Sequence, residues 1–63
     1  MTSEKTISIY RQVSELLTIV KIDREILKRK GEATFLTYQE RVRCQELDSI
    51  IERLEKIQEE LEA

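Results

Sequence analysis

Hydrophobic residues recur every three or four positions through most of the chain, which is the spacing of one face of an α-helix. In the second half the spacings of three and four alternate along one stripe, formed by Leu47, Ile50, Leu54, Ile57 and Leu61. Such a stripe is typical of the seam along which two helices pack in a coiled coil. The matching stripe in the first half comprises Ile9, Val13, Leu16, Val20 and Leu27, widened by Tyr10 and Leu17. The pattern predicts two amphipathic helices whose stripes face each other.

Few residues mark where the helices begin and end, because the chain has no proline and a single glycine. Thr2 or Ser3 can cap the first helix with a side-chain oxygen, and Glu4 then lies in its first turn. Gly31 is the residue that most easily takes the left-handed conformation at a helix C-terminus. We therefore expect the first helix to cover about residues 3–30.

The second helix can open at Thr34 or at Thr37. Thr37 is followed three residues later by Glu40, which is the spacing of a capping box. We expect this helix over about residues 35–62, where nothing interrupts it. Because only a few residues separate the two helices, they must lie antiparallel. The predicted fold is all-α: one helical-hairpin domain over residues 1–63.

A hairpin of 63 residues cannot enclose a core that is walled on all sides. We therefore expect it to complete a helical bundle with a second chain, either a homodimer partner or a different protein. Apolar residues outside the seam support this expectation and form a predicted partner-binding surface: Ile19, Ile22, Ile26, Phe35, Tyr38 and Val42. A turn centred near residue 31 places Ile22 and Ile26 level with Tyr38 and Val42, so this surface is expected at the turn end.

Charge is divided unevenly, since residues 1–31 carry seven Lys and Arg against four Asp and Glu, and residues 32–63 carry four against nine. Halves of opposite net charge favour antiparallel pairing of the helices, although exposed ion pairs contribute only about 0–1 kcal/mol each. Basic residues are interspersed with acidic ones, so we expect no nucleic-acid partner. No apolar run approaches the ~20 residues that span a bilayer, so we expect no membrane span. A single cysteine and a start without an apolar signal segment predict a cytoplasmic protein.

Candidate chemistry is sparse, because the chain has no histidine. A Ser-His or Cys-His nucleophile pair and a His-containing metal site are therefore excluded. Cys44 lies near Arg41 and Arg43, yet a lone cysteine in an amphipathic helix is usually only packed, and we assign it no role. We expect no cofactor, no metal and no catalysis. The chain is interpreted as a non-catalytic interaction module, adaptor or chaperone-like, that binds a protein through its apolar helix faces.

A second interpretation comes from the segment Cys44-Gln45-Glu46-Leu47-Asp48. It resembles the Ser-Gln-Glu-Leu-Asp signature of the small sporulation-regulating aspartyl-phosphate phosphatases of bacilli, which are helical hairpins with this motif on the second helix. Cys44 stands where that family has serine. The resemblance implies a phosphatase that lies on a response regulator and promotes hydrolysis of its phospho-aspartate, with Gln45, Glu46 and Asp48 at the catalytic site.

The chain as a whole has two long helices joined at a lone glycine, with Tyr38-Gln39 early in the second helix and Leu-Asp-Ser-Ile-Ile midway, at residues 47–51. In these features it is similar to the small co-chaperones that help hold needle subunits of bacterial type III secretion systems. That similarity implies a non-catalytic function: binding a larger helical-repeat chaperone and keeping an aggregation-prone subunit soluble. The two resemblances differ in what they require, because a phosphatase needs an exposed polar motif and a co-chaperone needs only the apolar stripes.

Overall fold

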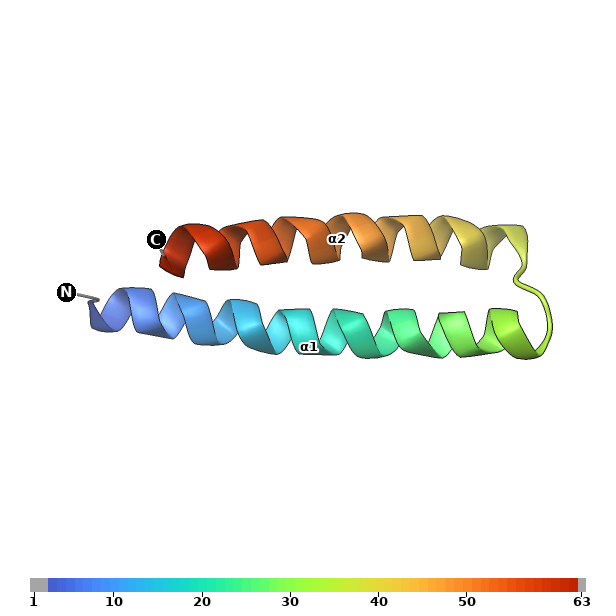
Figure 1. The fold of residues 1–63 in the computed structure, drawn as a ribbon, viewed down its shortest axis with the longest axis horizontal. Helices are drawn as coiled ribbons and strands as arrows, with labels where there is room; N and C mark the ends of the chain where they lie inside the picture. Colours follow the sequence, from blue (N-terminus) through green and yellow to red (C-terminus); the bar gives the residue numbers. More distant parts are fainter. Residues whose placement is uncertain (1–2, 63) are drawn as a thin grey trace.

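The structure is a computed structural model and describes residues 3–62. It contains two helices, α1 (Glu4–Ala33) and α2 (Tyr38–Glu62), connected by residues 34–37. Figure 1 shows them side by side and antiparallel, with the start of α1 and the end of α2 at the end opposite the turn. The hairpin is 49 Å long, and residues 3–62 contain no strand. The predicted all-α helical hairpin is confirmed.

The start of α1 is capped by a side chain, as predicted. Ser3 is extended, and its Oγ accepts a hydrogen bond from the backbone N–H of Thr6 at 3.1 Å. Glu4 follows in the first turn, where a carboxylate stabilises the positive end of the helix dipole. Thr2, the alternative cap, lies outside the described residues.

The predicted end of α1 at Gly31 is wrong, because the helix continues to Ala33. Gly31 has no positive φ, and the backbone N–H of Thr34 still bonds to the carbonyl of Lys30 at 2.8 Å. What Gly31 provides is space, since a Cβ on it would lie 3.3 Å from Cγ of Leu36. Leu36, in the connection, thus packs directly against the α1 backbone.

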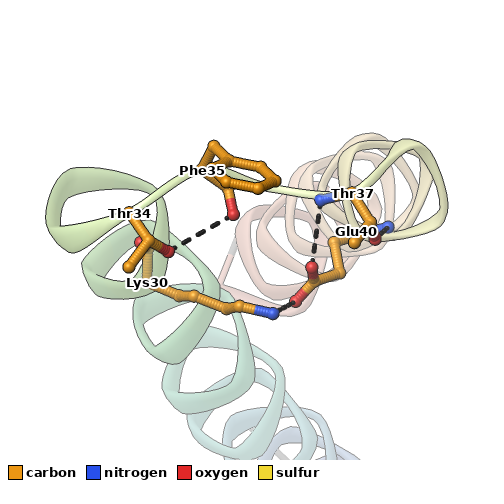
Figure 2. A network of polar contacts seen from close by, with 5 residues as sticks. All are labelled: Lys30, Thr34, Phe35, Thr37 and Glu40. Atoms are coloured by element: carbon orange, nitrogen blue, oxygen red, sulfur yellow. Dashed lines mark hydrogen bonds and ion pairs between the residues drawn. The ribbon is translucent and has the colours of Figure 1, made fainter.

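The capping box at the start of α2 is confirmed, and it selects Thr37 over Thr34 as the cap. Thr37 Oγ1 accepts from the backbone N–H of Glu40 at 3.2 Å, and Glu40 Oε1 accepts from the N–H of Thr37 at 3.0 Å. The other carboxylate oxygen of Glu40 receives Lys30 Nζ from α1 at 2.5 Å (Figure 2). The Lys30 bond, followed by the Thr37 backbone bond, lowers the pKa of Glu40 from 4.5 to about 2. The turn is therefore bound to both helices.

The core is short, as expected of two helices. Four apolar side chains are buried, namely Val13, Leu17, Cys44 and Leu47, and the last is 1 % exposed. Around them the seam continues through half-buried residues that include Val20, Leu27, Leu54 and Leu61. No polar side-chain atom is buried without a hydrogen-bond partner among the described residues. The hairpin satisfies its polar groups but keeps little of its apolar surface from water.

The predicted seam is wrong at four positions, because Ile9, Leu16, Ile50 and Ile57 are 44 %, 52 %, 39 % and 41 % exposed. The residue after each of them lies in the seam instead: Leu17 is buried, and Tyr10, Ile51 and Gln58 are half-buried. Half-buried Arg24 also enters the seam. Arg24 bonds across the seam to Asp48, and Gln58 bonds to Ser14. A polar side chain can enter a helix contact when its partner stands opposite, and hydrophobic periodicity does not detect such pairs.

The predicted register is wrong as well. Tyr10 pairs with Glu62 and Arg24 pairs with Asp48, so the numbers of residues at one level add to about 72. Ile22 is therefore level with Ile50 and not with Val42. The cause is that α1 continues beyond Gly31 to Ala33, which moves the centre of the connection toward Leu36.

Candidate functional site

The two long sides of the hairpin differ in chemistry. One side, called the polar flank, carries three hydrogen bonds between the helices: Tyr10 Oη to Glu62 Oε1 at 2.8 Å, Gln58 Nε2 to Ser14 Oγ at 2.9 Å, and Arg24 Nε to Asp48 Oδ1 at 2.7 Å. The Glu62 bond raises the pKa of Tyr10, and the Asp48 bond raises the pKa of Arg24. The polar flank is bridged within the chain at these three points, so the six side chains that form the bonds are already partnered.

Helix geometry determines which residues lie on the side of the hairpin opposite the polar flank. In an α-helix successive residues are about 100° apart, so the residues that directly precede the seam positions form a row along one side of the seam. Because the helices are antiparallel, their rotations run in opposite senses. The preceding rows of α1 and α2 therefore lie on the same side of the hairpin, whereas Ser14 and Asp48 lie on the other.

These two rows form the apolar flank, which comprises Ile9, Leu16, Ile19 and Ile26 on α1 and Ile50 and Ile57 on α2. All six are exposed, between 39 % and 61 %. The observed register places Ile57 level with Leu16 and places Ile50 between the levels of Ile19 and Ile26, so the two rows lie side by side in the middle of the hairpin. Rows of exposed apolar side chains of this kind are typical of interaction surfaces.

The predicted partner-binding residues do not form one cluster. Ile19 and Ile26 belong to the apolar flank, whereas Ile22 lies farther round α1, away from α2, and is 56 % exposed. Phe35 and Tyr38 are 79 % and 75 % exposed at the turn. Figure 2 shows the Phe35 ring projecting away from the Lys30 to Glu40 network.

Val42 is half-buried on α2, about eight residues from the level of Ile22. The expected juxtaposition of Ile22 and Ile26 with Tyr38 and Val42 therefore does not form. The exposed apolar surface lies along the length of the hairpin, and the aromatic pair at the turn is separate from it.

Residues 44–48 lie in three environments: the core, the polar flank and the opposite side of α2. Cys44 is buried in the core as a free thiol, and Leu47 is the most buried side chain. Gln45 and Asp48 are exposed toward the polar flank, and Asp48 is paired with Arg24.

Glu46 lies on the other side of α2, because residues two apart are about 200° apart on a helix. It pairs with Arg43 at 3.4 Å. Glu46 and Asp48 therefore do not converge on one point, and residues 3–62 contain no cluster of acidic, Cys or His side chains that could hold a metal ion.

Sequence reasoning missed Ile9, Leu16, Ile50 and Ile57 as surface residues because it placed them in the seam. A signal was present in α1, where two apolar rows lie one residue apart: Val13, Leu17, Val20 and Leu27, beside Ile9, Leu16, Ile19 and Ile26. One partner helix covers only one such row, so the other had to remain exposed. Arg24 and Gln58 carry no comparable signal, since their place in the seam depends on residues of the other helix.

Within residues 3–62, neither helix has a stretch long and apolar enough to cross a membrane. Comparison with protein families, curated proteins and solved structures finds no match to this chain.

Proposed function

We propose that this chain is a non-catalytic protein-interaction module, adaptor or chaperone-like, whose apolar flank packs against helices of a partner protein. The observation that carries the proposal is the row of exposed apolar residues shared by α1 and α2, from Ile9 to Ile26 and from Ile50 to Ile57. Two antiparallel helices form one layer of a bundle, and a second layer covers the exposed face in a stable bundle.

The free energy gained by burying the apolar flank indicates what kind of partner can bind it. Full burial of an isoleucine or leucine side chain contributes about 1.5–3 kcal/mol, so covering six that are half exposed gives on the order of 5–9 kcal/mol. Association itself costs about 4–15 kcal/mol. The flank therefore offsets this cost only if the partner also brings apolar surface. A helical protein meets this requirement, whereas a nucleic acid does not.

The cellular location is inferred from the single cysteine. Cys44 is the single cysteine and is a free thiol in the core, which is compatible with a reducing compartment. We place the chain and its partner in the cytoplasm on this basis.

The test uses two matched substitutions of exposed isoleucines. Ile19 is 56 % exposed on the apolar flank, and Ile7 is 48 % exposed on the polar flank beside Tyr10 and Glu62. Immobilised wild type and Ile7→Asp are expected to retain the same protein from an extract of the source organism, identified by mass spectrometry. Ile19→Asp is expected to lose it. Equal retention by both variants would contradict the proposal.

A second candidate function is hydrolysis of a response regulator's phospho-aspartate, because Gln45, Glu46 and Asp48 are all exposed, as that activity requires. Against it stand the pairing of Asp48 with Arg24 and the separation of Glu46 from Asp48 around α2. The discriminating variant is Asp48→Asn, which keeps an acceptor for Arg24. Our proposal expects partner binding to persist. Loss of phospho-aspartate hydrolysis with binding unchanged would favour the phosphatase.

A further inference from the structure

We propose that the occupant of the apolar flank is a second copy of this chain, and that two hairpins form a four-helix bundle with α1 of each copy over α2 of the other. The inference rests on the proposed function, since it names the partner of the same surface. In this arrangement the two-fold axis runs along the length of the hairpins, so both turns lie at the same end and every helix is antiparallel to its neighbours.

The first support is the size and composition of the face. The hairpin measures 49 × 14 Å between Cα atoms along and across its length. Face-to-face packing of two copies would therefore bury on the order of 1,400 Å², within the range of about 1,200–2,000 Å² of a stable interface. A second copy also brings the same six apolar residues, which is the apolar partner surface that this flank requires.

The second support is charge. Two charged residues, Asp23 and Arg53, interrupt the rows of the apolar flank, and neither forms an ion pair within residues 3–62. With the two-fold axis along the hairpins, levels are preserved between the copies. Asp23 of one copy then lies about one helical turn from Arg53 of the other, and the symmetry makes this contact twice. The two unpaired charges would satisfy each other.

The alternative two-fold arrangement lacks this match. If the axis crosses the hairpins, α1 lies on α1 and α2 on α2, with the turns at opposite ends. Arg53 lies between Ile50 and Ile57, near the middle of the flank, and would then face Arg53 of the other copy. Like charges in contact oppose association. The distribution of charge over the whole chain agrees with the first arrangement, because the half that contains α1 is basic and the half that contains α2 is acidic.

The test is sedimentation equilibrium of the purified chain across the micromolar range. Wild type and Ile7→Asp are expected to sediment as dimers. Ile57→Asp is expected to sediment as a monomer that retains its helical circular dichroism, because Ile57 is outside the seam. A wild-type monomer throughout this range overturns the second-copy proposal. Loss of dimer in Ile7→Asp as complete as in Ile57→Asp overturns the choice of flank.

Charge reversal tests the orientation. Asp23→Arg and Arg53→Asp should each weaken self-association by about tenfold or more, because each places like charges together in both symmetric contacts. An equimolar mixture of the two variants should dimerise as well as wild type, since every such contact in the mixed dimer joins opposite charges. A mixture no tighter than its components overturns this orientation.

The outcome also separates this inference from the proposed function. A monomeric wild type that retains another protein through Ile19 overturns the second-copy proposal and leaves the interaction module standing. A monomeric wild type whose binding to other proteins is unaffected by Ile19→Asp overturns both.

Discussion

The two flanks of the hairpin are built from the same helices but differ in how their side chains are partnered. On the polar flank, Tyr10, Ser14 and Arg24 of α1 each meet a hydrogen-bond partner on α2, so this side is bridged within one chain. On the apolar flank, Ile and Leu side chains stand half exposed with nothing opposite them in the chain. The comparison teaches that a minimal hairpin can fix its own register with polar contacts and reserve apolar surface for another molecule.

The largest effect is expected where a charge enters the seam. Leu47 is 1 % exposed, so Leu47→Asp buries a carboxylate without a partner, at a cost of several kcal/mol. A single core of this size rarely supplies more than about 3–5 kcal/mol, so the hairpin should unfold. Far-UV circular dichroism should report loss of helix, whereas Ile57→Asp should remain helical. Equal loss in both variants would mean that the apolar flank is core.

The polar flank is tested next, at Arg24, whose side chain is 31 % exposed in the contact with Asp48. We expect the aliphatic stem to matter more than the charge, because exposed ion pairs contribute little. Arg24→Met should therefore lower the free energy of unfolding by less than about 0.5 kcal/mol, and Arg24→Ala by about 1–2 kcal/mol. Urea denaturation measures both. If Met and Ala are equally destabilising, the ion pair itself holds this flank.

The turn sets the register on which both flanks depend, and its stability should respond to acid. Folding lowers the pKa of Glu40 from 4.5 to about 2, so the folded state favours the charged form. Its stabilisation is fully present above about pH 4.5 and is lost as the pH falls toward 2. The difference in Tm between wild type and Glu40→Gln should be constant above this window and shrink within it.

Lys30→Met provides the control for this titration, because Lys30 is the main cause of the lowered pKa. In this variant the pH range over which Glu40 loses its stabilising effect should become narrower, with its lower limit at higher pH. An unchanged difference in Tm between wild type and Glu40→Gln from neutral pH to pH 2 would show that Glu40 does not stabilise the turn.

The smallest effect is expected at Gly31. It lies inside α1 with ordinary helical backbone, so Gly31→Ala should gain helix propensity, offset by a contact of 3.3 Å between the new Cβ and Leu36. Leu36 belongs to the connection and can shift, so we expect a net stabilisation of about 0.5 kcal/mol. Thermal denaturation measures it. A loss of about 1 kcal/mol would indicate the left-handed helix end that the sequence suggested.

Local features of the hairpin were determined by the sequence alone. The helices follow from uninterrupted spacings of three and four, and the caps follow from Ser3 and from the Thr37 and Glu40 pair. These features depend on residues within four positions of each other, so a linear pattern contains all the information they need. The antiparallel arrangement follows too, because a short connection permits no other.

The tertiary structure decided which apolar row of each helix became the seam. In α1 the rows through Leu17 and through Leu16 are both apolar and lie about 100° apart, so periodicity does not choose between them. Contacts between the helices choose the row, through the pairs of Arg24 with Asp48 and of Gln58 with Ser14, together with the continuation of α1 to Ala33. The apolar flank exists because these contacts between residues distant in sequence left the other row exposed, and no local pattern records such contacts.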